Sequence, residues 1–475
     1  MWNKLLFIFL LLLFGGSSTL QAQKKYSLEE CIVYARENNL SVKQSELNLE
    51  ISEDQKSSQI GNFLPDANLG SSYSYNNGFS IDPTTNRILN NESNSFGFNV
   101  TSQWNIFTGL TNLNKYRKAK FDLLSAKYNL EQMKDNISLQ VANAYLDIIL
   151  NKEFLKVAEE QEQLSLKEVE RMQRFVDAGR KTKGDLYESQ ATLANDGQQL
   201  VSVENNLMLS KLALTQLLQI EFTKDFDIND EDFPIPSLVM MEKTNEEVYQ
   251  KALETQFLIK NYENKILSSK KDLSIAKGSY SPTLSLVYQF STRVLLEKNR
   301  SIITGNTSQY PIGYVGSTGE TVFTDVAANG SENYPFLDQM NDGKNHYVGL
   351  NLRIPLFNRF NARTSVRLKR VQLKQVELEM EVEKQKLRQS IEKAQADANA
   401  ALKTYKSGEK ALESIGEAYK YAQQKRDVGA ISEYDYNQSR NRYVQAQSTM
   451  LRSKYDFIFK VKILEYYFGE RFEGM

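Results

Sequence analysis

The spacing of apolar residues predicts two very long helices in this chain. Between residues 108 and 176 there is no Pro, and apolar residues recur at intervals of three and four, as on one face of a helix. Residues 358–428 also lack Pro and are rich in Lys, Glu, Gln and Ala, which favour helix. At 1.5 Å per residue each helix would be about 100 Å long. A single globular domain could not contain such a helix.

Each long helix is followed by a segment in which apolar residues recur every seven positions. This repeat is typical of helices that pack as a coiled coil, so we expect each long helix to form a hairpin with the segment that follows it. A DNA-binding leucine zipper would show the same repeat, but it would need a basic region that this sequence lacks. The repeating residues are Leu186, Leu193, Leu200, Leu207 and Leu214, and then Tyr436, Tyr443, Met450, Phe457 and Leu464.

The two predicted hairpins turn at the same arrangement of residue types. A Gly would end the incoming helix in a left-handed conformation. Three positions later a hydroxyl side chain would cap the outgoing helix, and an Asp three positions after that would complete a capping box. These residues are Gly179, Thr182 and Asp185 in the first turn, and Gly429, Ser432 and Asp435 in the second.

Four short segments alternate apolar and polar residues and are predicted strands. About ten residues with this alternation is the pattern of strands in outer-membrane β-barrels, although a half-buried sheet of a soluble protein would show it too. A membrane barrel needs at least eight strands, so we expect a barrel shared between chains, with eight strands from two copies or twelve from three. The segments are approximately residues 66–76, 95–106, 283–293 and 346–356.

The whole pattern occurs twice, which predicts a duplicated unit. We expect residues 23–240 to form the first structural repeat and residues 241–475 the second. The repeats differ most in the loop between their strands, because the second loop, 292–345, is longer and rich in Gly, Asn, Ser and Thr, as exposed barrel loops are. Three pairs lie 250 positions apart, Phe107 and Phe357, Gly179 and Gly429, Asp185 and Asp435, and one pair, Pro65 and Pro282, lies 217 apart.

Charge and rare residues exclude several classes of function. With 58 basic and 59 acidic residues, the chain has no net field that would attract nucleic acid. The single Cys, Cys31, and the single His, His346, offer no internal disulfide and no metal-binding or His-dependent catalytic cluster. We therefore expect no enzyme and no cofactor, and we expect Cys31 to be a buried residue of the first helix.

The start of the chain predicts export. Residues 1–22 contain one Lys, ten consecutive apolar residues and then a region rich in small residues, which indicates a secretory signal peptide. An uncleaved anchor is the alternative, because Leu20 stands where a cleavage site prefers a small residue. After residue 22 no run of eighteen apolar residues occurs, so we expect no membrane-spanning helix.

Several short motifs resemble the TolC family of outer-membrane efflux channels. The resemblance covers essentially the whole chain after the predicted signal peptide. It implies a homotrimer in the cell outer membrane, with a twelve-stranded β-barrel continued by an α-helical tunnel through the periplasm. The motifs are the opening segment 26–35 followed by Asn38 and Asn39, the strand starts Leu64-Pro65 and Ser281-Pro282, the segment 354–357 before the second long helix, and the two Gly-x5-Asp turns.

The resemblance also implies the partners and the mode of action. The channel would be the exit duct of a tripartite efflux or type I secretion system and would work with a periplasmic adaptor and an inner-membrane pump, with outer-membrane lipid around the barrel. Residues 221–245 would be the mid-tunnel segment that links the repeats. The duct would be passive and would open when a bound adaptor shifts the helical tips.

In the family the tunnel closes at the tips, where aspartates ring the axis. Asp185 and Asp435 match these positions, and three copies of Asp435 around one axis would favour cations. A second family aspartate is replaced by Gln438 in this chain. Helix capping alone would also explain both aspartates.

A family Tyr and a family Arg that tie the closed tips together are absent. Their positions hold Arg426 and Ile431. We therefore expect a different closed network, or one relocated to Arg180, Arg426 and Tyr434.

Two other functions remain as alternatives. A periplasmic adaptor also uses a long helical hairpin, but it has one hairpin flanked by compact β domains, whereas two hairpins and four strands are predicted here. A soluble coiled-coil scaffold would explain the helices but not the strands.

Overall fold

The computed structural model describes most of the chain after the predicted signal peptide. That peptide, residues 1–22, lies outside the described residues. The chain forms two compact units, which we call the helical unit and the sheet unit. The described residues are 25–81, 88–230, 233–296 and 299–470. The helical unit takes its residues from 1–53, 121–267 and 374–475, and the sheet unit takes its residues from 54–120 and 268–373.

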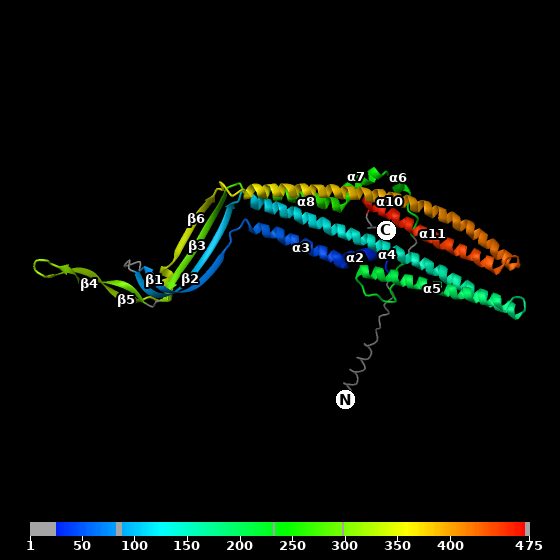
Figure 1. Cartoon of the computed structure of the whole chain (residues 1–475), viewed down its shortest axis with the longest axis horizontal. Helices are drawn as coiled ribbons and strands as arrows, with labels where there is room; N and C mark the ends of the chain where they lie inside the picture. Colours follow the sequence, from blue (N-terminus) through cyan, green and yellow to red (C-terminus); the bar gives the residue numbers. More distant parts are fainter. Residues whose placement is uncertain (1–24, 82–87, 231–232, 297–298, 471–475) are drawn as a thin grey trace, which may run out of the picture. The chain divides into compact units, whose positions relative to one another are not determined.

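The helices of the two repeats, labelled in Figure 1, correspond pair by pair. The paired helices contain 11, 22, 67 and 36 residues in both repeats. The predicted duplicated, mainly helical fold is therefore confirmed. The pairs are α2 (Leu28–Asn38) and α7 (Asn245–Thr255), α3 (Leu40–Gly61) and α8 (Phe257–Gly278), α4 (Thr111–Asp177) and α10 (Asn361–Asp427), and α5 (Lys183–Leu218) and α11 (Glu433–Phe468). The short α6 (Val239–Glu242) lies between the repeats.

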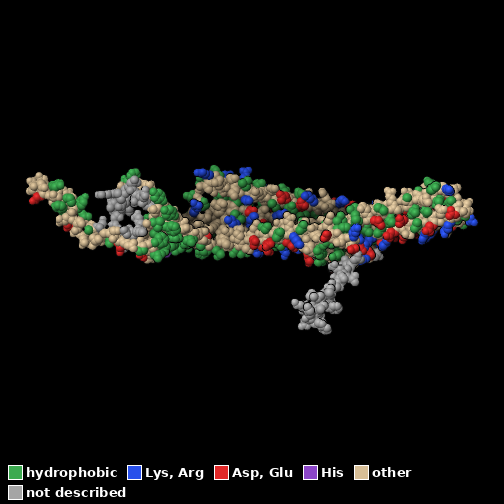
Figure 2. Space-filling view, turned by 90° about the horizontal axis from the view of Figure 1, so that it is seen from below, with side chains coloured by type: hydrophobic (Ala, Val, Ile, Leu, Met, Phe, Trp, Pro, Cys, Tyr) green, Lys and Arg blue, Asp and Glu red, His purple; other side chains and the backbone are tan. Residues whose placement is uncertain are grey.

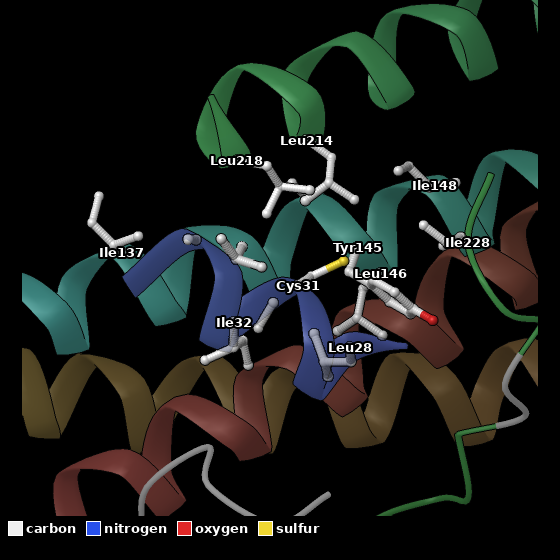
Figure 3. Close-up of a cluster of buried hydrophobic side chains, with 14 of the residues drawn as sticks. Leu28, Cys31, Ile32, Ile137, Tyr145, Leu146, Ile148, Leu214, Leu218 and Ile228 are labelled. Atoms are coloured by element: carbon white, nitrogen blue, oxygen red, sulfur yellow. The ribbon is translucent and has the colours of Figure 1, made fainter. Parts of the chain in front are cut away.

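The largest core of the helical unit packs α2, the middle of α4 and the end of α5 around one apolar cluster (Figure 3). Its α4 members include residues at the predicted spacing of three and four, such as Ile137, Val141 and Ile148, together with residues between them, so the middle of α4 is buried on more than one face. Cys31 of α2 lies in this cluster and is fully buried, as predicted. Among the described residues, no helix is both long enough and apolar enough to cross a membrane.

The second repeat builds a smaller cluster from equivalent positions. The two sets show that each copy of the unit uses the same core positions. All ten residues of the predicted seven-residue repeats in α5 and α11 are also buried or half-buried. In the first repeat the shared core positions are Cys31, Ala35, Val42, Ile137 and Val141, and in the second they are Val248, Ala252, Ile259, Leu387 and Ile391.

A buried tyrosine attaches the segment between the repeats to α4. The Tyr145 hydroxyl lies 3.1 Å from the carbonyl oxygen of Asn229 and 3.3 Å from that of Tyr26, and it donates to both. The two acceptor segments also form a parallel bridge, in which the Asn229 N–H donates to the Tyr26 carbonyl over 3.0 Å. This bonding satisfies backbone groups that would otherwise be buried without partners.

Lysines on two helices hold the same segment by charge. Asp227 lies 2.8 Å from the Lys152 ammonium of α4 and 3.1 Å from the Lys211 ammonium of α5. Burial by itself would raise the pKa of Asp227, but the hydrogen bonds and charges of the two lysines outweigh it and lower the pKa to about 2. The linking segment is therefore fixed to both helices of the first hairpin.

The sheet unit contains one four-stranded antiparallel sheet in the order β1, β2, β3, β6. β1 and β6 are its edges, and in the described chain each pairs on one side only. The strands are β1 (Asn68–Ile81), β2 (Ile88–Phe107), β3 (Thr283–Leu295) and β6 (Asn345–Arg353).

The register gives this sheet one apolar and one polar face. Residues directly opposite each other share a face. Trp104 lies opposite Leu286, which lies opposite Leu350, while polar Asn105 lies opposite Ser285. Trp104 and Leu350 are exposed and Leu286 is half-buried, and Figure 2 shows hydrophobic side chains gathered over the strands. An uncovered apolar face of this extent indicates a surface that water does not normally meet.

The connection between β3 and β6, predicted as a long loop at 292–345, contains regular structure. β4 (Asn299–Tyr314) and β5 (Thr321–Asn333) pair as a separate two-stranded sheet, and α9 (Phe336–Asp342) follows. Gly305 and Gly319 have φ of +77° and +70°, one at a register shift in β4 and one at the turn between the strands. The glycines therefore mark a bulge and a turn and not the exposed loop that the composition predicts.

We expect the stabilisation by Asp227 to depend on pH. The folded pKa of about 2 lies below the ordinary value of 3.8, so the stabilisation is complete above about pH 4 and is lost as the pH falls towards 2. This difference between the two pKa values of Asp227 corresponds to about 2 kcal/mol of the free energy of unfolding. Asp227→Asn should lower the thermal midpoint by about 1–3 °C at neutral pH, measured by far-ultraviolet circular dichroism in detergent.

The difference between wild type and Asp227→Asn should close as the pH falls through this range. Glu221→Gln is the control, because Glu221 is exposed and has no ion pair in the described chain. A difference that stays constant down to pH 3 would contradict the assignment.

Candidate functional site

Figure 1 shows the two helical tips, between α4 and α5 and between α10 and α11. They end their incoming helices with the same backbone geometry. Gly179 and Gly429 have φ of +70° and +75°, the left-handed region that glycine adopts without strain. Around each glycine two backbone bonds close the last turn, which is the Schellman motif. The N–H donors and carbonyl acceptors are Arg180 to Phe175 (2.8 Å) and Gly179 to Val176 (3.0 Å), and Ala430 to Lys425 (2.7 Å) and Gly429 to Arg426 (2.9 Å).

The outgoing helices differ slightly in their caps. Thr182 and Asp185 form a complete capping box, in which the Thr182 N–H donates to the Asp185 carboxylate over 2.9 Å. These bonds from Thr182, first from its backbone and then from its side chain, lower the pKa of Asp185. Ser432 accepts from the Asp435 N–H and donates to its carboxylate over 2.7 Å, but the reciprocal backbone bond is not formed. The predicted capping box is therefore complete at the first tip only.

Most of the predicted gate residues lie on the surface of the single chain. Asp435, Gln438, Arg180 and Tyr434 are exposed, and Asp185 is half-buried. Within the described chain, the side chains of Arg180 and Tyr434 have no ion pair and no hydrogen bond. Both are thus accessible to neighbouring molecules at the tips.

Arg426 is different, because it joins the two hairpins of one chain. Its guanidinium donates to the Glu168 carboxylate of α4 over 2.9 Å, and only 15% and 16% of the two side chains are exposed. The guanidinium also lies 3.9 Å from the ring centre of Tyr436, a cation–π contact. Arg426 therefore connects α10, α11 and α4 just above the second tip.

Other side chains extend this network, which we call the tip network. Arg171 lies 2.9 Å from Glu168 and 3.7 Å from Glu433. Burial, and then the nearby Glu168 charge, raise the pKa of Glu433. The Tyr436 hydroxyl lies 3.0 Å from that of Tyr419, and burial raises the Tyr436 pKa. The network therefore holds two glutamates close together by means of two arginines.

A second ionic contact, further from the tip, also joins the hairpins. Arg440 of α11 is almost fully buried, and it donates to Asp196 of α5 over 2.9 Å and to Ser165 of α4 over 2.6 Å. Ser165 in turn bonds to Asp196. A cavity of about 410 Å³, lined by α4, α5 and α11, opens beside these residues. In the described part of the chain, no group of three or more His, Cys, Asp or Glu is placed to hold a metal ion.

The sequence indicates Arg426 as a candidate gate residue but does not indicate its partners. The positions 250 residues away from Glu168, Arg426 and Arg440 are Ala418, Val176 and Gln190, so the repeat gives no signal for these contacts. Their partners lie 244 to 275 positions apart in the chain. Only the three-dimensional packing of the helices brings them together.

The similarity of the chain to known proteins decides its family. A family model described as outer membrane efflux protein matches residues 31–218 and 248–462, which is most of the chain. The chain belongs to the outer membrane efflux protein family. A search of curated proteins finds no match for this efflux protein.

Solved structures agree with the fold of the efflux protein. The VceC outer membrane protein of Vibrio cholerae aligns with a TM-score of 0.73 at 14% identity, covering 94% of this chain and 97% of that chain. The CmeC outer membrane channel of Campylobacter jejuni aligns with a TM-score of 0.72 at 16% identity, covering 94% of this chain and 87% of that chain. The open state of the MtrE outer membrane channel of Neisseria gonorrhoeae aligns with a TM-score of 0.69 at 14% identity, covering 94% of this chain and 90% of that chain.

These findings confirm the predicted family of the efflux protein. The protein is localised in the outer membrane. The adaptor and scaffold alternatives are not favoured. The tips described above are thus the turns of the two helical hairpins of an outer-membrane efflux protein.

We expect Arg426 and Glu168 to be energetically coupled. Because the pair is largely buried, replacing one partner leaves a charge without its partner, which costs about 3 kcal/mol locally. Arg426→Gln and Glu168→Gln should each increase hydrogen exchange of backbone amides in residues 160–185, measured by mass spectrometry. The loss of local stability in the double variant should be smaller than the sum of the losses in the two single variants, by about 1–3 kcal/mol.

Arg174→Gln is the matched control, since this exposed arginine of α4 has no ion pair in the described chain and should leave exchange unchanged. Additive effects of the two single substitutions would show that the pair is not coupled.

Proposed function

We propose that three copies of the chain form an exit duct through the outer membrane for efflux or secretion. The observation that carries this proposal is the four-stranded sheet, which has an exposed apolar face and two edges that the described chain leaves unpaired. A lipid bilayer suits the apolar face, but it does not tolerate open edges, because unpaired backbone groups have no water to bond to there.

Copies of the chain would remove the edges by pairing β1 of one with β6 of the next. Three copies close a barrel of twelve strands, within the range of membrane barrels, and the polar face of each sheet then lines the interior. Two copies would close eight strands and would meet the same constraint. The family resemblance favours the trimer.

The long helices would continue the barrel as a periplasmic tunnel. In this arrangement residues 23–240 and 241–475 act as two repeats, each giving one long hairpin to the wall. Equal helix lengths support this role, because both hairpins then reach the same level. The duct is passive, and its partners are a periplasmic adaptor and an inner-membrane pump.

The tips would form the gate. Asp185 and Asp435 lie at the start of the outgoing helices, where three symmetric copies of Asp435 make a ring of carboxylates. Arg180, Tyr434 and Gln438, exposed in the single chain, face neighbouring copies or the adaptor. Arg426 acts within one chain, where its bond to Glu168 holds the second hairpin against the first. Opening would require the hairpins to move apart, driven by preferential binding of the adaptor to the open form.

Fractionation and native mass spectrometry test the assembly. Expressed in a Gram-negative host, the protein should be recovered in the outer-membrane fraction as an oligomer that dissociates on heating in dodecyl sulfate. Native mass spectrometry should give three times the mass of the chain. Recovery as a soluble periplasmic monomer would refute the channel, and a dimer would refute the twelve-stranded barrel.

We expect Asp435→Ala to reduce the cation selectivity of the channel. Removing three carboxylates from one ring should lower the cation-to-anion permeability ratio by about twofold or more, measured from the reversal potential in a planar bilayer with a salt gradient. Ser432→Ala is the matched control, because it removes the cap that Asp435 shares but leaves the charge.

An unchanged reversal potential in Asp435→Ala would exclude the ring. The same shift in both variants would instead assign the effect to helix capping.

A further inference from the structure

The junction between strands and long helices carries a band of exposed apolar side chains, which we call the collar. Its most exposed members are Leu356 at 94% and Phe357 at 73%, and the band continues on the chain segments beside it. Such a band is large for a surface that faces water. The collar consists of Phe63, Leu64, Trp104, Ile106, Phe107, Leu110, Ile354, Leu356, Phe357 and Phe360.

The backbone beneath part of the collar adopts a strained conformation. Leu110, Arg359 and Phe360 adopt left-handed conformations with φ between 54° and 62°, which side chains other than glycine rarely do. Leu110 and Phe360 occupy equivalent positions in the two repeats, 250 residues apart, and both are more than half exposed. Strain that recurs in both copies indicates that the outward position of these side chains has a use.

Immediately after the collar, both long helices begin with exposed cations, which we call the belt. Residues 108–121 and 354–376 contain no Asp or Glu, although the whole chain is balanced in charge. Figure 2 shows Lys and Arg side chains on the helix ends next to the strands. The belt consists of Lys115, Arg117 and Lys120 on α4 and of Arg363, Arg367 and Arg370 on α10, all exposed and without an ion pair in the described chain.

The distance between collar and belt fits the headgroup layer of a bilayer. From Leu110 to Lys120, and from Phe360 to Arg370, the helices rise about 15 Å at 1.5 Å per residue, with the first cations after about 5–8 Å. The polar region on each side of the hydrocarbon core is about 5–8 Å thick. On α10 the cations are four and three positions apart, so they lie on one face of the helix.

We propose that the collar and the belt bind the periplasmic leaflet of the outer membrane, with the belt selecting anionic glycerophospholipids. The aromatic and aliphatic collar lies at the boundary of the acyl chains, where such side chains gather. The belt cations pair with lipid phosphates, which supply the negative charges that these cations lack within the described chain. This inference rests on the outer-membrane placement of the proposed channel.

Trp104 provides an internal reporter for the test, because it belongs to the collar and is 42% exposed. With Trp2→Phe it is the only tryptophan of the chain. The protein is reconstituted in phosphatidylcholine vesicles that contain a minor share of dibrominated phosphatidylglycerol or of dibrominated phosphatidylcholine. Bromine quenches the fluorescence of tryptophan that it contacts. We expect quenching by phosphatidylglycerol to exceed that by phosphatidylcholine by about two- to fivefold at low salt, and less at high salt.

Removing the cations should abolish this preference. Replacing all six belt cations with Gln should bring the quenching ratio to about one, and replacing only the three α4 cations or only the three α10 arginines, in variants that are easier to assemble, should lower the ratio towards one. The matched control replaces three exposed lysines that lie further along α10 and have no ion pair in the described chain, and it should keep the wild-type ratio. These are Lys403, Lys406 and Lys410.

The outcomes separate this proposal from the channel itself. If neither lipid quenches Trp104, the membrane placement is wrong, and the proposed function falls with it. If both lipids quench equally in the wild type, only the anionic selectivity of the belt is refuted. If the variants keep the lipid preference but shift the reversal potential, the cations line the tunnel and act on anions passing through it.

Discussion

The backbone hydrogen bonds of the sheet edges constrain the whole molecule. β1 and β6 each leave one row of N–H and C=O groups without a partner in the described chain. In water such edges are a hazard, and in lipid they are intolerable. A chain that places its apolar sheet face in a membrane must therefore pair these two edges, and in the proposed assembly further copies of the chain would pair them.

The two hairpins have unequal roles in the ionic contacts that join them. Their cores are built from equivalent positions, and their tips turn through the same Schellman motif. Their ionic contacts are not equivalent, because Arg426 and Arg440 of the second hairpin both bond to residues of the first. The two hairpins thus match in length and core, and their ionic contacts distinguish the second hairpin from the first.

Much of the fold could be predicted because its signals are local. The period of three and four in α4, the seven-residue repeats of α5 and α11, and the Gly179 and Gly429 turns all depend on neighbours within a few residues. The family resemblance could be recognised for the same reason, since its motifs are short.

Contacts between distant helices left no comparable signal. Nothing near Glu168 in the sequence indicates that Arg426, 258 positions away, bonds to it. The β4 and β5 hairpin was missed for another reason, because the glycines of a bulge and a turn look like those of a loop when no partner strand is known. The missing capping bond at Ser432 could not be predicted either, because Ser and Thr are both ordinary N-cap residues.

The equal lengths of α4 and α10, 67 residues each, limit how this protein could change during evolution. Deleting one residue from one of them would shorten that rod by about 1.5 Å and turn everything beyond the deletion by about 100°. The apolar seam would then rotate away from its partner helix. Only changes of about seven residues keep the seam aligned, and they would have to occur in all four long helices together. The length of such a protein should therefore vary in steps of about 10 Å, so that a lineage with a wider periplasm would have gained whole heptads in parallel.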